Sequence, residues 1–186
     1  MKATYYIFDI KESPKSLVIY KNTLNRKIEN KFFQGSFIEE PLQTELYVEG
    51  RNPPDLLTSG GLLVASKRLK MLFDQLIING VQFIPAKVIH KSGIEVPGYH
   101  IINVLNIYSA WDKENTVWVN EDQKDAGQYP EFNVWRVALK KEVIGNLHIF
   151  RLEKPQFPIY ISKYLKEEIE KHKFDVGVGF YPVYAY

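Results

Sequence analysis

The amino-acid sequence predicts an α+β fold with a mixed or antiparallel sheet and two principal helices. Aromatic residues make up 14% of the 186 residues, a content that favours strands over long helical bundles. Short β-branched and aromatic segments recur along the chain, and two of them lead into amphipathic helical patterns that begin at a serine. Hydrophobic residues make up 45%, enough for a sizeable core, so we expect residues 1–186 to form a single domain.

The N-terminal portion, residues 1–58, is predicted to be less regular than residues 59–186. Its strand-like segments are residues 5–10 and 17–20. Residues 21–31 are polar and basic, which predicts a loop or an exposed ribbon. Pro53 and Pro54 then remove backbone donors and fix the chain, so we expect a loop and a soft boundary there.

The first helix is predicted after Ser66, whose hydroxyl can accept hydrogen bonds from the free amides of the first helical turn. Apolar residues follow at the spacing of one buried helix face: Leu69, Leu72, Phe73, Leu76 and Ile77. Gly80 is expected to end the helix by taking the left-handed conformation. Strands are expected on either side, over residues 62–65 and 81–90.

The most strand-like segment is residues 99–111, which follows a predicted loop at residues 91–98. Both of its faces are largely apolar, so we expect a central strand that is covered on both sides. Asn103 and Asn106 are polar exceptions. Buried amides must be paired, so we expect both to bond neighbouring backbone, with a catalytic role as the weaker alternative.

The C-terminal part is predicted to contain the second helix. Ser162 is expected to cap it, and the helix extends to about residue 173 with Leu165 and Ile169 turned inward. Glu167 and Lys171 are expected to form a supporting pair on its surface. Further strands are expected at residues 132–139, 147–152, 159–161 and 176–184.

Two strand-helix-strand units resemble each other in sequence. Each has Ser-Lys-x-Leu-Lys at its helix start, at residues 66–70 and 162–166, and Phe-x-Pro in its second strand, at residues 83–85 and 180–182. A duplicated binding element would explain the similarity. Capping and packing account for every shared residue as well, so we favour a recurring structural unit.

The charge balance and the missing residue types exclude several classes of protein. The chain has 24 basic and 22 acidic residues, a net charge of +2, which is too even for a dedicated nucleic-acid binder. It has no cysteine, which excludes a disulfide scaffold, thiol catalysis and zinc sites with thiolate ligands. No signal-peptide pattern and no run long enough to span a membrane are visible, so we expect a cytoplasmic protein.

The sequence offers little catalytic chemistry. It contains no phosphate loop, dinucleotide fingerprint, nucleophile elbow or His-Glu-x-x-His zinc motif. His90 and His100 flank a predicted hairpin loop and could face each other, but only Glu95 is near them as a further ligand. We therefore expect no cofactor, no metal and no enzymatic activity.

The densest acidic region lies between residues 112 and 131, with six acidic residues against Lys113 and Lys124. Aromatic residues among acidic ones suit a basic protein partner, because charge steers the encounter and aromatic rings anchor the contact. The predicted partner-binding residues are Asp112, Trp118, Glu121, Asp122, Asp125 and Tyr129. Two alternatives stay open: the acidic segment at residues 39–49 could contact the partner instead, or the loop could be merely solvated, since such a loop would have the same composition.

Residues 59–183 resemble a bacterial immunity-protein family that is found beside polymorphic toxins and was formerly described as a domain of unknown function. The resembling segments are LLVAS at residues 62–66, GVQFIPAKV at 80–88, YHIINVL at 99–105, Asp112, HIFRL at 148–152 and IYIS at 159–162. The resemblance implies a cytoplasmic antidote that binds and blocks a cognate toxin domain, often a nuclease or other hydrolase delivered between competing bacteria. The family has no established catalytic residues, so none is carried over.

The nearly neutral chain departs from the acidic character expected of an antidote to a nuclease. A local acidic patch, not the net charge, is therefore the expected complement to the toxin. Two other functions stay open. One is a small-molecule enzyme with a pocket near Asn103, Asp112 and Arg136, and the other is a carbohydrate-binding module that uses Trp111, Asp112 and Trp118.

Overall fold

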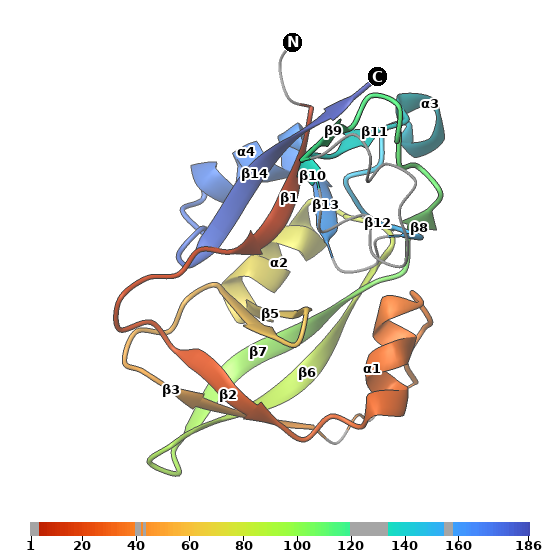
Figure 1. Cartoon of the computed structure of the whole chain (residues 1–186). Coiled ribbons are helices and arrows are strands. Elements are labelled where there is room, and N and C mark those ends of the chain that lie inside the picture. Colours follow the sequence, from red (N-terminus) through yellow and green to blue (C-terminus); the bar gives the residue numbers. More distant parts are fainter. Residues whose placement is uncertain (1–3, 40–41, 43, 120–133, 155–157) are drawn as a thin grey trace.

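The computed structural model describes residues 4–39, 42, 44–119, 134–154 and 158–186. These residues form two six-stranded mixed sheets, a two-stranded ribbon and four helices (Figure 1). The α+β class with mixed sheets is thus confirmed, with four helices where the sequence predicts two principal ones.

The first sheet has the strand order β2 (Val18–Asn22), β3 (Glu45–Glu49), β6 (Val81–His90), β7 (Glu95–Val104), β5 (Leu62–Ser66), β4 (Leu56–Ser59). The second sheet has the order β11 (Ala138–Leu139), β14 (Val178–Ala185), β1 (Tyr5–Ile10), β13 (Ile159–Ser162), β12 (Ile149–Leu152), β8 (Ile107–Tyr108). The ribbon consists of β9 (Val117–Trp118) and β10 (Val134–Arg136). The helices are α1 (Arg26–Phe33), α2 (Lys67–Gln75), α3 (Lys141–Ile144) and α4 (Lys163–Lys171).

Helices α2 and α4 begin at the predicted serines. The Ser66 hydroxyl oxygen accepts a hydrogen bond from the Leu69 amide at 3.3 Å, and the Ser162 hydroxyl oxygen accepts one from the Leu165 amide at 3.2 Å. Each serine has an extended backbone, as an N-cap residue should. The inward residues of both helices are buried, as predicted: Leu69, Leu72, Phe73, Leu165 and Ile169.

The prediction was wrong about details at the ends and surfaces of these helices. Ile77 has a φ of 53° and is 77% exposed, so it ends the helical turn instead of packing inward. A β-branched residue rarely adopts this conformation, which is why the apolar spacing pointed to a longer helix. On α4, Lys171 pairs with Glu168 at 3.0 Å, whereas Glu167 pairs with Lys163 at 3.4 Å.

The same arrangement of strands occurs around α2 and around α4. Strands β5 and β6 are both antiparallel to β7, which lies between them, and α2 connects them. In the second sheet β13 and β14 are both antiparallel to β1, which lies between them, and α4 connects them. A parallel strand follows on one side of each trio, β3 next to β6 and β11 next to β14. The middle strand of the second trio comes from the opposite end of the chain.

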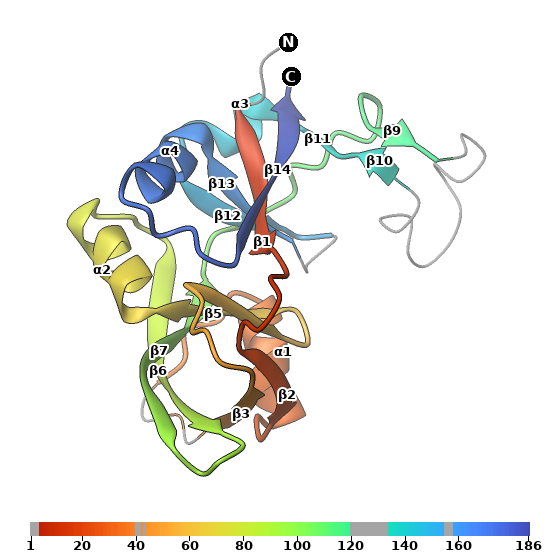
Figure 2. The same cartoon turned by 90° about the vertical axis from the view of Figure 1, so that its left-hand side faces the viewer.

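The first sheet curls until its two edge strands meet (Figure 2). The Asn22 side-chain amide at the end of β2 donates to the Ser59 hydroxyl at the end of β4, at 2.7 Å. At the other end of this seam, Ser16 forms a parallel bridge with Asn52. Strands β2 and β4 are not hydrogen-bonded neighbours, so the result is a nearly closed barrel. The buried residues inside the barrel come mainly from its strands, but they also include Phe32, which belongs to helix α1.

A shared core lies between the sheets. It contains inward residues of α2 and α4 together with strand residues of both sheets, such as Ile102 and Ile161. A further cluster around Phe150 and Tyr160 covers the other face of the second sheet. None of the helices in the described ranges is long and apolar enough to cross a membrane.

Asp55 ties the two sheets together. Its buried carboxylate accepts hydrogen bonds from the Ser66 hydroxyl at 2.8 Å, from two nitrogens of Arg68 at 2.5 Å and from the Val176 amide at 3.0 Å. These bonds use the whole acceptor capacity of a carboxylate. Because Ser66 ends β5 and Val176 precedes β14, the bonds link the first sheet to the second.

Two segments outside the predicted helices and strands contain regular structure, although the first was expected to be a loop or an exposed ribbon. Residues 21–31 finish β2 and begin α1, whose first turn is capped by Asn25 accepting from the Lys27 amide at 2.8 Å. Residues 140–146, expected only to join two strands, contain α3. Strand β7 begins at Glu95, so the predicted loop at 91–98 is shorter than expected.

The segment predicted as one strand over residues 99–111 is divided between the two sheets. Strand β7 ends at Val104, and β8 pairs with β12 of the second sheet. Asn106 lies at the crossing, where its side-chain amide donates to the Ile149 carbonyl at 3.2 Å and its own carbonyl accepts from the Arg151 amide at 2.8 Å. As predicted, this asparagine bonds backbone and fixes a turn.

Candidate partner-binding site

The ribbon of β9 and β10 stands away from the rest of the molecule (Figure 2). Trp118 lies opposite Val134, and Val117 lies opposite Arg136, with an irregularity in the register at Trp135. Side chains alternate between the two faces of a strand, so one ribbon face is turned to the body and the other to solvent.

A buried threonine holds the base of the ribbon. The Thr116 hydroxyl donates to the Asp112 carbonyl at 2.6 Å, and its oxygen accepts from the Trp111 indole at 3.0 Å and from the Ala138 amide at 3.1 Å. A hydroxyl has one donor and two acceptor sites, and here all three are used. Thr116 is only 6% exposed, so these bonds are shielded from competing water.

Asp112 orders the turn that leads into the ribbon. Its carboxylate accepts from the Glu114 and Asn115 amides at 3.2 and 3.1 Å, and from the Asn115 side chain at 2.7 Å. Burial raises the pKa of Asp112, but the hydrogen bonds outweigh burial and hold this pKa below its usual value. The carboxylate is therefore charged at neutral pH and engaged in the turn.

Trp118 packs on the inner face of the ribbon. It is 9% exposed, its ring lies 5.5 Å from that of Trp111, and its indole donates to the Lys113 carbonyl at 3.2 Å. The Lys113 ammonium lies 5.3 Å from the centre of the Trp111 ring. The two tryptophans thus form an apolar support under the ribbon.

The outer face of the ribbon carries exposed apolar side chains. Trp135 is 75% exposed, and Val117 and Val119 are 40% and 44% exposed. The Arg136 guanidinium lies 4.6 Å from the centre of the Tyr184 ring, which connects β10 to the end of β14. The ribbon therefore presents a large aromatic side chain from a firmly attached base.

The sequence-predicted partner-binding residues fall into two groups. Asp112 and Trp118 come together at the base of the ribbon, where both are buried. Glu121, Asp122, Asp125 and Tyr129 lie outside the described residues. Sequence reasoning missed Trp135, although a tryptophan between Val134 and Arg136, directly after the acidic stretch, was a signal for an exposed aromatic on a strand.

Asn103 lies in the first sheet and has no bonding partner in common with Asp112. Its side-chain amide donates to the Ser36 carbonyl at 2.9 Å and to the Gln82 side chain at 3.0 Å. Gln82 in turn binds the backbone of Ile38. Asn103 thus attaches the segment after α1 to the barrel, in agreement with the predicted structural role.

The two histidines that flank the β6–β7 turn do not face each other. His100 lies opposite Pro85 in the strand register, whereas His90 follows Ile89, which lies opposite Glu95. The His90 ring contacts the Ser92 hydroxyl and the Gly50 carbonyl instead. The conceivable metal pair at this hairpin was therefore wrong.

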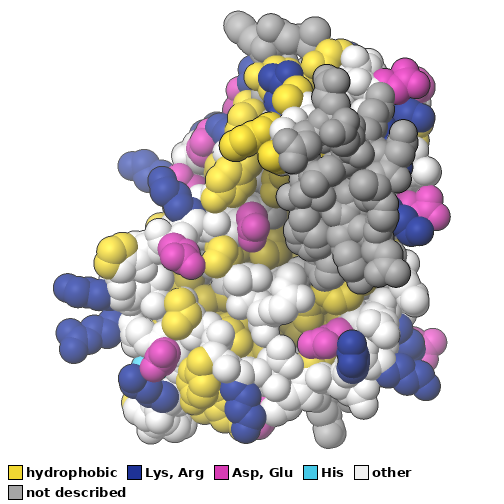
Figure 3. All heavy atoms as spheres, viewed as in Figure 1, with side chains coloured by type: hydrophobic (Ala, Val, Ile, Leu, Met, Phe, Trp, Pro, Cys, Tyr) yellow, Lys and Arg dark blue, Asp and Glu magenta, His cyan; other side chains and the backbone are white. Residues whose placement is uncertain are grey.

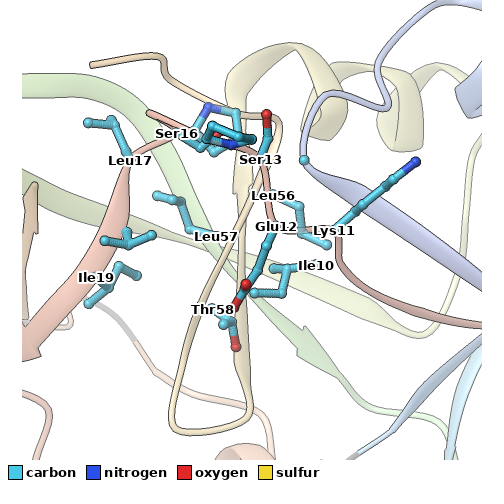
Figure 4. A pocket seen from close by; sticks show the side chains of 14 residues that line it. Ile10, Lys11, Glu12, Ser13, Ser16, Leu17, Ile19, Leu56, Leu57 and Thr58 are labelled. Carbon is cyan, nitrogen blue, oxygen red and sulfur yellow. The ribbon is translucent and has the colours of Figure 1, made fainter. Parts of the chain in front are cut away.

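A cleft of about 640 Å³ lies where the chain passes from β1 to β2 (Figure 4). Its apolar wall includes Ile10, Leu17, Ile19, Leu56 and Leu57. Glu12 and Thr58 bring oxygen atoms to it, while the Lys11 side chain points away. A second cavity of about 690 Å³ lies beside Glu45 and Lys87. Neither is lined by Asn103, Asp112 or Arg136.

Hydrophobic side chains also gather on the face shown in Figure 3, over β1 and β14. Tyr181 of β14 is 51% exposed and Tyr186 is 41% exposed. Trp135 is thus the larger and the more exposed aromatic side chain, which makes the ribbon the more prominent candidate for a protein contact.

Comparison with known proteins identifies the family of this protein. Among curated proteins, the sequence comparison finds no match. The model of the Immunity protein family (Imm11) matches residues 10–185, nearly the whole chain, and the protein therefore belongs to this family.

Proposed function

We propose that the protein is a cytoplasmic antidote that binds and neutralises the toxin domain of a polymorphic toxin used in competition between bacteria. Membership of an immunity-protein family supports an immunity function against a toxin. The observation that supports the binding mode is the ribbon. It presents Trp135, which follows the acidic stretch in the sequence, from a base held by buried hydrogen bonds.

The acidic stretch suits a basic toxin surface. Between residues 112 and 131 the chain has six acidic residues against two basic ones, although the whole chain carries a net charge of +2. Opposite charge raises the rate of association, and a fast encounter matters for an antidote. Nucleases bind a polyanion through basic surfaces, so a nuclease is the toxin class that this stretch fits best.

Glu121, Asp122 and Asp125 steer the toxin in this proposal, with Tyr129 and the ribbon in the contact. Asp112 and Trp118 act by fixing the base of the ribbon, because their side chains are engaged there. The protein acts by binding alone, without a cofactor and without catalysis. Residues 1–186 act as one domain, since β1 lies inside the sheet formed by the C-terminal strands.

The test is a charge reversal of Glu121, Asp122 and Asp125 to lysine. Association with the toxin domain encoded beside the gene should slow, and its dependence on salt should weaken. The matched control reverses three exposed acidic residues elsewhere, Glu12, Glu95 and Asp175, and changes the net charge equally. Association and protection of cells unchanged in the first variant would overturn the proposed surface. An absence of any complex with the original protein would overturn the proposed function.

A further inference from the structure

Trp135 is an unusual side chain to leave in solvent. It is 75% exposed although Trp118, on the facing strand, is only 9% exposed. Val117 of β9 and Val119, which directly follows that strand, are exposed as well, at 40% and 44%. Several exposed apolar residues on paired strands mark a protein contact more often than an isolated exposed residue does.

We infer that Trp135 is the anchor of the toxin interface and enters an apolar pocket on the toxin that is ringed by basic residues. The inference rests on the proposed function and names the residue that supplies most of the binding energy at that site. Tryptophan is the residue type most enriched among such energetic hot spots, because one side chain removes a large apolar area from water.

The base of the ribbon is already ordered in the free protein, so Trp135 should lose little conformational entropy when the toxin binds. Thr116 has every hydrogen-bonding site occupied, and it connects the turn at Asp112 to Ala138 at the start of β11. Trp118 packs against Trp111 directly behind the ribbon. A group that is already held in position costs less to order when a partner binds it.

The chemistry of the partner follows from the charges around the anchor. In the sequence, Glu121, Asp122 and Asp125 lie between β9 and β10, the two strands of the ribbon. Arg136 follows the anchor in the sequence, and its guanidinium lies over the Tyr184 ring, 4.6 Å from the ring centre. A basic rim on the toxin is therefore attracted to the acidic segment, while its apolar centre receives the indole.

The experiment compares Trp135→Ala with Trp135→Phe and with Tyr181→Ala, an exposed aromatic on β14 that serves as the control. Binding to the toxin domain encoded beside the gene is followed at several salt concentrations. Trp135→Ala should speed dissociation by about 30-fold or more, the factor that matches the usual hot-spot threshold of about 2 kcal/mol. Association rate and salt dependence should stay within about twofold, because no charge changes.

Trp135→Phe should recover part of the loss, and Tyr181→Ala should bind normally. The melting temperature of Trp135→Ala should equal that of the original protein, because the side chain is largely exposed. If the toxin dissociates from Trp135→Ala as slowly as from the original protein, the assignment of Trp135 as the anchor is wrong, while the proposed function is unaffected. Failure of the original protein to bind the toxin would instead overturn the function.

A second readout follows the indole itself. Trp135 is the most exposed of the three tryptophans, so it should dominate quenching of fluorescence by acrylamide in the free protein. Formation of the complex should remove most of that quenching. Quenching that is unchanged in a saturated complex would show that Trp135 stays in solvent and would contradict the inference.

Discussion

At the scale of single residues, the polar side chains of this protein mainly organise backbone. Asn103 and Asn106 bond main-chain atoms of other segments, Asp112 accepts from main-chain amides of its own turn, and Asp55 joins the two sheets. The sequence allowed this role to be predicted for the two asparagines, because an amide in an apolar strand needs a partner. It did not identify Asp55, whose partners are distant in the chain.

Asp112 gives the protein a pH-dependent contribution to stability. Its pKa is lower in the folded protein than in the unfolded chain, so the folded state favours the charged carboxylate. This stability is present at neutral pH and is lost as the pH falls through the carboxylate range and past the folded pKa. Asp112→Asn should therefore be less stable than the original protein at pH 7, and the difference should shrink between about pH 5 and pH 3.

The measurement is the free energy of unfolding of both proteins in urea across that range. Asp9→Asn is a suitable control, because Asp9 is exposed and its carboxylate accepts a local bond from the next amide at 2.7 Å. A difference between Asp112→Asn and the original protein that grows on acidification would contradict the assigned sign.

At the scale of elements, the sequence predicted correctly those features that depend on interactions between residues close together in the chain. The caps at Ser66 and Ser162 act over three residues, so both helix starts were correct. Helix α1 was missed because its apolar residues, Ile28, Phe32 and Phe33, are few and pack against a barrel core that forms only when the whole sheet is assembled. The division of residues 99–111 between two sheets was missed for the same reason, since it depends on partners far along the chain.

The candidate site was likewise predicted only in part, because its geometry depends on strands that are far apart in the sequence. Composition identified the acidic stretch, but the sequence gives no direct measure of which tryptophan is buried. Trp118 lies against Trp111 and Trp135 faces solvent because of the register between β9 and β10. Strand register is set by pairing, and these two strands are separated by fifteen residues.

Thr116→Val should loosen the ribbon, although valine has nearly the same size and shape as threonine. The change removes the hydroxyl and leaves the Ala138 amide and the Trp111 indole without their acceptor. Unsatisfied buried groups of this kind cost about 1–3 kcal/mol each. Hydrogen exchange at these two N–H groups should become faster, and toxin binding should weaken although no contact residue has changed.

Thr116→Ser is the matched control, because it keeps the hydroxyl and should keep both slow exchange and binding. Unchanged exchange at the Trp111 indole in Thr116→Val would show that the hydroxyl does not hold the ribbon.

At the scale of the whole molecule, both trios of strands share one pattern, and the shared core lies between them. The repeated Ser-Lys-x-Leu-Lys segments indicated two similar helical connections, but not the strand that each of them spans. Strand β1 takes the central place in the second trio, more than a hundred and fifty residues from its partner β13 in sequence. Sequence patterns of short period carry no information on such a pairing.

The shared core predicts a single unfolding transition. All three tryptophans lie between residues 111 and 135, outside the barrel, whereas the far-ultraviolet circular dichroism signal reports both sheets. Because α2 and α4 contribute to the same core, the two signals should change together in urea. Separate midpoints would show that the barrel and the second sheet unfold independently and would contradict the single domain.

The position of β1 has a consequence for biosynthesis. This strand precedes all the other described strands in the sequence, so it is translated before both of its neighbours, β13 and β14. The strands of the barrel, in contrast, form one continuous stretch that ends at Val104 and can fold while translation continues. At about 5–20 residues per second, roughly 4–16 s then pass before β14 is complete. Until that moment β11 lacks the strand with which it pairs, so the chain that leads out of the ribbon is attached to the second sheet only after β14 has been synthesised.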